Sequence, residues 1–247
     1  MCATEAPVLV LTAIPEELKP LLKRLRAAAA GRVEGRRVFR IGAAGARPSL
    51  VLSSTGDGSR NAAGRMGRLC EVYEPKAVVG LGAAGALTSS LAALDLVASG
   101  ELQNGSGAVP APDEALLSRA LAAGARRATL VTTPAPISSV SSKKRLADRL
   151  GAQTPAAVDM ESAAWARAAA GAGIPFVVVR AISDTADEEL PAYLSECVGP
   201  EGGIQRRVVL ARALRRPSTI PELVRMRRRV VECGQRLSDF LLDGFFG

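Results

Sequence analysis

Two carboxylates in this sequence lie where a bond-cleaving site would need them. Glu161 directly precedes an alanine-rich segment, residues 162–170, which predicts a helix. Ser183 and Asp184 end the run 175–184, whose valine-rich centre is typical of a strand buried on both faces of a parallel sheet. Open α/β sheets bind ligands at the carboxyl ends of their strands, so we expect both carboxylates to face one crevice. A hydrolytic or group-transfer reaction needs such a pair.

The composition limits which other chemistry is available. The 247-residue chain contains no histidine, which leaves acid–base catalysis to aspartate and glutamate. Its four cysteines, Cys2, Cys70, Cys197 and Cys233, show no C-x-x-C spacing, so we expect neither a zinc site nor a thioredoxin-like site. We interpret them as reduced, mostly buried thiols of a cytoplasmic protein, and we predict no metal or other cofactor.

The positive charge of the chain is concentrated in one late segment. The formal net charge is +8 at pH 7, and residues 206–229 are rich in arginine. A solvated helix face explains such a segment, and contact with an anionic membrane surface is the alternative. Aromatic residues make up only 3% of the chain, which argues against base stacking and against a nucleic-acid partner. Neither a signal peptide nor a membrane-spanning run is recognisable.

The elements that would position the carboxylates alternate between strands and helices. Strands are predicted at 8–11, 38–41, 50–53, from 77, at 94–99, 128–132 and 177–179. Helices are predicted at 15–26, 62–73, 113–123, 141–150, 162–170, 204–214 and 220–242. This alternation indicates an α/β fold with one doubly wound sheet. We predict a single domain over residues 1–247, with a basic helical tail at about 200–247.

Three loops at the ends of predicted strands carry the remaining candidate residues. Glu16 and Glu17 fall in the first turn of the first helix, where both are suited to capping, and Glu16 is also a candidate catalyst. Residues 80–87 are poor in side chains, so their backbone can approach a ligand closely. Between these two loops, a glycine loop leads into a helix and either binds an anion or makes a tight turn. Its residues are Gly56, Asp57, Gly58, Ser59 and Arg60.

Several blocks of the sequence resemble the nucleoside phosphorylase/nucleosidase superfamily. They are residues 8–22, 54–63, 80–87 with 95–97, 158–161 and 178–184, in matching order and spacing from 8 to about 187. The Met-Glu pair at 160–161 and the Arg-x-x-Ser-Asp motif at 180–184 are the most specific of them. The resemblance implies a three-layer α/β/α sandwich with a mixed, mostly parallel central sheet. It also implies a homo-oligomer: dimers are common among nucleosidases, and trimers or hexamers among phosphorylases.

The pattern is most similar to that of methylthioadenosine/S-adenosylhomocysteine nucleosidases. By this resemblance Glu161 binds the ribose hydroxyls, with Met160 packed under the sugar. Asp184 is the general acid for the departing base, and Glu16 falls where those enzymes keep the carboxylate that activates water. Further contacts to ribose and base are expected from Asp159, Ser183, Ala83, Gly85 and Ile137. Small-molecule nucleosides are the expected partners.

Departures from the family pattern leave the specificity open. The arginines that hold phosphate in phosphorylases are replaced by Glu16-Glu17 and by residues 79–80, which favours water as the nucleophile. Arg60 keeps phosphorolysis, with inorganic phosphate as co-substrate, as an alternative. Residues 133–137 lack the usual aromatic residue for the base, and Asp57 replaces an apolar residue near the 5′ end of the sugar.

The tail carries one further resemblance. Residues 190–191, 210–217 and 220–225 are similar to the hopanoid-associated branch of the superfamily, which implies removal of adenine from a lipid-linked adenosine. We therefore predict cleavage of the N-glycosidic bond of a purine nucleoside, with adenine favoured as the base. A futalosine-type nucleosidase and a nucleoside-binding protein without catalysis are the alternatives.

Overall fold

The computed structural model describes residues 5–105, 107–151, 154–199, 203–215 and 219–247. The strands are β1 (Val8–Thr12), β2 (Ala29–Val33), β3 (Arg36–Ile41), β4 (Leu50–Ser54), β5 (Ala77–Ala86), β6 (Leu96–Asn104), β7 (Arg126–Thr132), β8 (Ala156–Asp159) and β9 (Phe176–Asp184). The helices are α1 (Pro15–Arg24), α2 (Ser59–Tyr73), α3 (Glu114–Ala122), α4 (Val140–Leu150), α5 (Ser162–Gly171), α6 (Arg206–Arg215) and α7 (Ile220–Asp239). A 3-10 turn, η1 (Ala192–Cys197), precedes α6, and a π-helical turn, η3 (Phe240–Phe245), follows α7.

The strands form one mixed sheet that closes on itself at one side. Their order is β2-β3-β4-β1-β5-β8-β7-β6-β9, and β9 also pairs with β5. A closed ring is therefore formed by β5, β8, β7, β6 and β9. The sheet continues from β5 through β1, β4 and β3 to β2 at its free edge. The pairs β1–β4, β1–β5, β5–β9, β6–β7 and β7–β8 are parallel, and β5–β8 and β6–β9 are antiparallel. The mixed, mostly parallel sheet is as predicted, whereas the closure was not foreseen.

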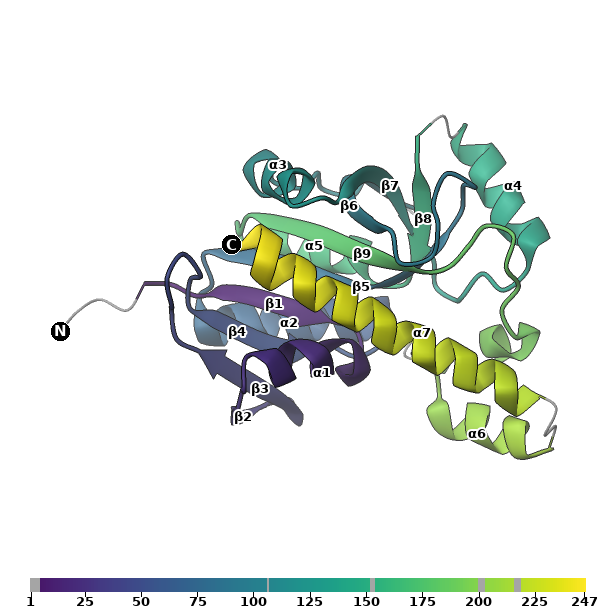
Figure 1. Cartoon of the computed structure of the whole chain (residues 1–247), viewed down its shortest axis with the longest axis horizontal. Helices are drawn as coiled ribbons and strands as arrows, with labels where there is room; N and C mark the ends of the chain where they lie inside the picture. Colours follow the sequence, from purple (N-terminus) through teal and green to yellow (C-terminus); the bar gives the residue numbers. More distant parts are fainter. Residues whose placement is uncertain (1–4, 106, 152–153, 200–202, 216–218) are drawn as a thin grey trace.

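Helices cover both faces of this sheet (Figure 1). Met66 of α2 packs in one core with Trp165 of α5. Leu18 of α1, Leu117 of α3 and Leu237 of α7 belong to the core on the opposite face. The yellow helix α7 in Figure 1 crosses the molecule on the side of α1. The predicted three-layer α/β/α sandwich is confirmed.

Strand β5 is built of small residues because bulky groups pack directly on its backbone. A side chain on Gly80 would come within 2.7 Å of the Trp165 ring, and one on Gly85 within 2.7 Å of Asp184 Oδ2. The sequence predicted a loop after residue 80, but the strand continues to Ala86, since it pairs with β9 and then with β8. The side-chain-poor segment is therefore part of a strand that is paired with neighbouring strands, and not a loop.

Other differences from the predicted elements have simple causes. Strand β2 was missed because its sequence, AAGRV, has no hydrophobic alternation and is largely exposed; pairing with β3 holds it. Strand β8 was also missed, because it is only four residues long. The last helix was expected to reach residue 242, but its α-helical pattern ends at Asp239 and continues as η3. Within the described residues, no helix is long and apolar enough to cross a membrane.

Candidate active site

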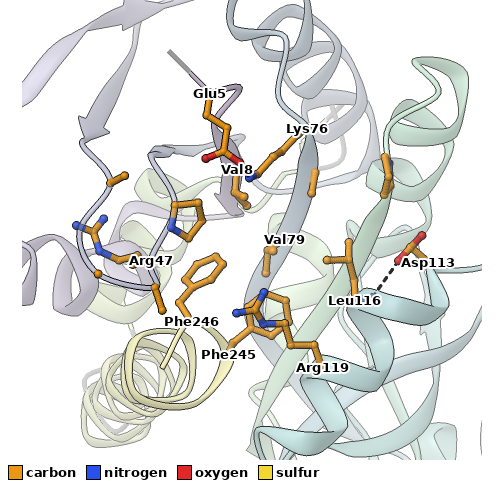
Figure 2. A pocket seen from close by; sticks show the side chains of 16 residues that line it. Glu5, Val8, Arg47, Lys76, Val79, Asp113, Leu116, Arg119, Phe245 and Phe246 are labelled. Atoms are coloured by element: carbon orange, nitrogen blue, oxygen red, sulfur yellow. Dashed lines mark hydrogen bonds and ion pairs between the residues drawn. The ribbon is translucent and has the colours of Figure 1, made fainter. Parts of the chain in front are cut away.

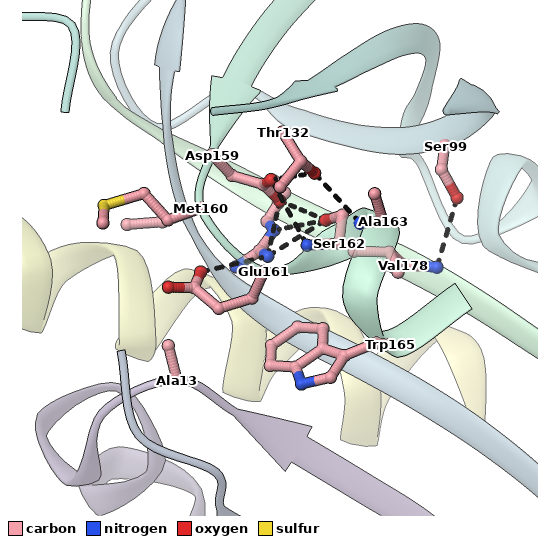
Figure 3. A network of polar contacts seen from close by, with 12 residues as sticks. Ala13, Ser99, Thr132, Asp159, Met160, Glu161, Ser162, Ala163, Trp165 and Val178 are labelled. Carbon is pink, nitrogen blue, oxygen red and sulfur yellow. Dashed lines mark hydrogen bonds and ion pairs between the residues drawn. The ribbon is translucent and has the colours of Figure 1, made fainter. Parts of the chain in front are cut away.

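A buried polar network lies where β8 and β9 approach α5 (Figure 3). Asp159, the last residue of β8, accepts a hydrogen bond from Thr132 Oγ1 at 2.8 Å and pairs with Arg180 Nη2 at 2.5 Å. Ser162 Oγ donates to Asp159 and accepts from Arg180 Nη2 at 3.0 Å. Both carboxylate oxygens of Asp159 are thus engaged by protein donors. Asp159, a predicted substrate contact, is therefore paired with Arg180, Thr132 and Ser162 in this structure.

Glu161 stands at the start of α5 without capping it. Its Oε1 accepts a hydrogen bond from the backbone N–H of Gly58 at 2.9 Å, and its Oε2 lies 3.6 Å from Arg180 Nη2. Burial raises the pKa of Glu161 from 4.5 to about 8, and Asp159 and Glu17 add to that effect while Arg180 opposes it. A ligand that donates hydrogen bonds or brings positive charge to Glu161 would therefore favour its ionised form.

Glu17, and not Glu16, is the glutamate of α1 that reaches this network. Its Oε1 accepts from the backbone N–H of Ala83 at 2.9 Å, and its Oε2 accepts from those of Ala13 and Ile14 at 3.2 Å. Burial raises the pKa of Glu17 above 4.5, although the N–H groups of Ala83 and Ile14 and the charge of Arg180 oppose the rise. Glu16 is only half-buried. The sequence assigned the water-activating position to Glu16, one residue away from the carboxylate that the fold buries.

Arg180 connects the carboxylates, and the sequence analysis did not single it out as a site residue. Its side chain is fully buried, and its guanidinium lies 4.8 Å from the centre of the Trp165 ring. A side chain at Gly82 would overlap Arg180 Nη1 and would lie 3.2 Å from Glu17 Oε1. Nη1 is buried and donates to no acceptor among the described residues. A buried donor beside a buried carboxylate is a ready site for a small polar ligand.

Asp184 is the last residue of β9, the strand that also carries Arg180. Gly85 of β5 pairs with Val158 of β8 and with Asp184 of β9, so the ends of β8 and β9 flank one glycine. Ser183 Oγ donates to Asp184 Oδ1 at 2.6 Å, and Lys143 Nζ lies 2.6 Å from Oδ2. The strands that lead to Glu161 and to Asp184 therefore end beside the same residue of β5.

The glycine loop at residues 56–60 contacts Met160 and Glu161, which connect β8 to α5. Ser59 Oγ donates to the backbone oxygen of Met160 at 2.9 Å, and the Gly58 N–H binds Glu161 as described. Arg60, by contrast, is exposed, so it is not enclosed with the carboxylates. Ile137 packs against the small core that contains Val131 and Val158. Among the described residues, no group of three or more His, Cys, Asp or Glu side chains is arranged to hold a metal ion.

A cavity of about 440 Å³ lies at the opposite end of the sheet, where β1 and β5 begin (Figure 2). Most of its charged side chains have partners, although Arg47 Nη1 is buried and donates to no acceptor among the described residues. Lys76 pairs with Glu5, and the Arg119 guanidinium lies 5.3 Å and 5.6 Å from the ring centres of Phe245 and Phe246. The convergent buried carboxylates, and not this cavity, mark the candidate active site.

Comparison with known proteins identifies the family. The model of the phosphorylase superfamily matches residues 7–198. The chain belongs to this superfamily. A 5'-methylthioadenosine/S-adenosylhomocysteine nucleosidase of Geobacillus kaustophilus is 34% identical over 161 residues, which cover 56% of this chain and 68% of the relative. The corresponding protein of Halalkalibacterium halodurans is 27% identical over 184 residues, covering 66% of this chain and 79% of the relative.

Solved structures show the same superfamily fold. A Helicobacter pylori 5'-methylthioadenosine/S-adenosyl homocysteine nucleosidase superposes with a TM-score of 0.75 at 16% identity, over 98% of both chains. The futalosine hydrolase of the same organism gives a TM-score of 0.75 at 17% identity, over 97% of both chains. The predicted superfamily and its fold are thus confirmed.

Proposed function

We propose that the protein is a nucleosidase that hydrolyses the N-glycosidic bond of a purine nucleoside, with adenine as the favoured base. The observation that carries this proposal is a set of three buried carboxylates around β9: Glu17 and Glu161 both interact with Arg180 of this strand, and Asp184 ends it. The superfamily match supports it, because it covers residues 7–198 and so includes all three carboxylates, and relatives of the chain are nucleosidases.

The sugar is the part of the substrate that suits Glu161. A carboxylate with a raised pKa gains most when hydroxyl groups donate to it, since they replace the water it lost on burial. Cleavage of the glycosidic bond builds positive charge on the ribose ring. An ionised Glu161 bound to the ribose hydroxyls stabilises that charge as it develops. The half-buried Met160 beside it supplies an apolar contact for the sugar.

Glu17 and Arg180 are the residues that would bind the nucleophilic water. A water molecule between them would accept a hydrogen bond from Arg180 Nη1 and donate one to Glu17. As the water oxygen bonds to C1′, Glu17 takes its proton, and the raised pKa makes this carboxylate a better base near neutral pH. A phosphate dianion in the same place would meet Glu17 and Glu161, and the charge of Arg180 is already shared with Asp159. Hydrolysis is therefore favoured over phosphorolysis.

Asp184 suits the leaving base. Asp184 lies at the end of β9 beside Gly85 of β5. Because this glycine has no side chain, a planar base can approach the backbone closely there. A proton passed from Asp184 to a ring nitrogen neutralises the base as the C1′–N bond breaks, and the bonding electron pair leaves with the base.

Product analysis tests this function directly. The panel contains adenosine, methylthioadenosine, S-adenosylhomocysteine, futalosine and a lipid-linked adenosine, each incubated in H₂¹⁸O with and without phosphate. We expect free base and a ribose product that carries one ¹⁸O, at a rate independent of phosphate. A ribose 1-phosphate that forms only with phosphate would identify a phosphorylase. Failure to release any base would identify a binding protein and contradict the proposal.

We further propose that the basic tail contacts an anionic membrane surface. Ile220, Val224 and Val231 are exposed and lie four and eleven residues apart, so they share one face of α7. The opposite face carries Cys233 and Leu237, which are buried. An apolar stripe among exposed arginines is typical of helices that lie in the membrane interface. Homo-oligomeric assembly and a cytoplasmic location stay predictions.

Vesicle sedimentation tests the membrane contact. We expect the protein to bind vesicles that contain phosphatidylglycerol, to ignore pure phosphatidylcholine, and to dissociate in high salt. Reversing three exposed arginines of α7, Arg225, Arg227 and Arg228, to glutamate should weaken binding at least ~10-fold. The matched control reverses three exposed basic residues at α1, Lys19, Lys23 and Arg26. Equal losses in both variants would show only a general charge effect.

A further inference from the structure

Helix α4 places a buried lysine beside Asp184. The side chain of Lys143 has no exposed surface, and its Nζ donates to Asp184 Oδ2 at 2.6 Å. The same ammonium donates to the backbone oxygens of Thr185 at 2.7 Å and of Glu188 at 2.8 Å. These three acceptors use its full set of donors, so its orientation is fixed.

The neighbouring lysine shows that this burial is specific. Lys144 has a side chain that is 75% exposed and pairs with Asp148 one helical turn later, as an ordinary surface lysine does. Burying an ammonium is costly, and hydrogen bonds to three oxygen acceptors offset part of that cost. The fold therefore maintains one positive charge inside the protein, in contact with the residue that the proposed reaction uses as its acid.

Proton transfer from Asp184 creates charge at this contact. When Asp184 gives its proton to the leaving base, the electron pair of its O–H bond stays on the carboxylate. The new negative charge then lies against the ammonium of Lys143, while Ser183 Oγ donates to the other oxygen. Asp184 has only 7% of its side chain exposed, so water screens the interaction weakly.

We infer that Lys143 is a positioning residue for the leaving-group step. Its ammonium stabilises the Asp184 carboxylate as the proton departs, and it fixes the carboxyl group relative to the base. The inference rests on the proposed function, because it assigns Lys143 a role exercised through Asp184.

The test compares Lys143→Met with Lys144→Met. With the best nucleoside of the panel we expect Lys143→Met to lower kcat about 10²-fold and Lys144→Met to change it by less than about threefold. The second substrate is 4-nitrophenyl riboside, whose acidic phenol leaves without needing a proton. With it, Lys143→Met should lower kcat by less than about fivefold. Lys143→Arg, which keeps the charge, should retain more nucleoside activity than Lys143→Met.

A double variant separates positioning from folding. Asp184→Asn should lower kcat for the nucleoside at least ~10²-fold. Adding Lys143→Met to it should change kcat by less than about threefold, because the lysine then has no acid to act through. Equal loss on both substrates, or a further loss in the double variant, would overturn the inference in favour of a purely structural lysine. Absence of base release by the wild type would overturn the proposed function as well, whereas normal activity of Lys143→Met would overturn the inference alone.

Discussion

Glu17→Gln should lower kcat about 10³-fold, whereas Glu16→Gln should leave it within about threefold of the wild type. The two glutamates are adjacent, yet only Glu17 is enclosed with Arg180. The amide of glutamine cannot take a proton from water, so the variant loses the base and keeps most of the shape of the side chain. Steady-state kinetics with the best nucleoside gives the effect, which should fall on kcat more than on KM.

The comparison needs a control for folding. Glu17 also accepts three backbone N–H groups, from Ala13, Ile14 and Ala83, and a glutamine cannot satisfy all of them. We therefore expect a lower melting temperature for Glu17→Gln, and kinetics should be measured well below it. If Glu16→Gln is the variant that loses turnover, then the assignment made from the sequence holds and the burial of Glu17 serves only to cap α1.

Glu161→Gln should abolish most activity and stabilise the protein at alkaline pH. The loss in kcat should be at least ~10²-fold, because a neutral amide cannot balance the positive charge that develops on the ribose. The folded state holds the Glu161 proton up to pH about 8, while the unfolded chain releases it near 4.5. The folded state therefore binds more protons across this window, and the wild type loses stability as pH rises through it.

The glutamine variant has no carboxyl group to ionise, so its free energy of unfolding relative to that of the wild type should rise from pH 5 to pH 8. We expect this difference to increase by about 1–3 kcal/mol over that range, or roughly 2–4 °C in melting temperature for each kcal/mol. Arg180 keeps Asp159 as a partner at 2.5 Å, which limits the cost of removing the second carboxylate. Glu71→Gln, at an exposed glutamate of α2, is the matched control and should show no such trend. A pH-independent difference would contradict the assigned cause.

The sequence predicted the parts of the fold that have a local signal. The valine-rich run that becomes β9 and the alanine-rich helix α5 are legible because burial on both faces demands apolar residues throughout. The motif residues Glu161 and Asp184 could be located in the same way, since Glu161 directly precedes α5 and Asp184 ends β9. The closure of the sheet through β5 and β9 has no local signal, because it depends on pairing between strands far apart in the chain.

The side chains missed by the sequence differ from their neighbours only in helical phase. Successive residues of a helix point about 100° apart, so Glu17 is buried and Glu16 is not, once Pro15 starts α1. The same holds for Lys143 and Lys144: Lys143 shares a face of α4 with Leu146, Ala147 and Leu150, which pack against the core, whereas Lys144 does not. Arg180 was visible in the motif, but its position between three carboxylates follows only from the fold.

Trp165 is the chain's single tryptophan, and its surroundings make it an intrinsic optical probe. The indole is buried on Gly80, donates from Nε1 to Thr55 Oγ1 at 3.3 Å, and faces the Arg180 guanidinium. Any ligand that changes the charge around Arg180 changes the electric field on that ring. Emission from one unlabelled residue should therefore report ligand binding beside Arg180, so binding and turnover can be followed separately in the same unmodified protein.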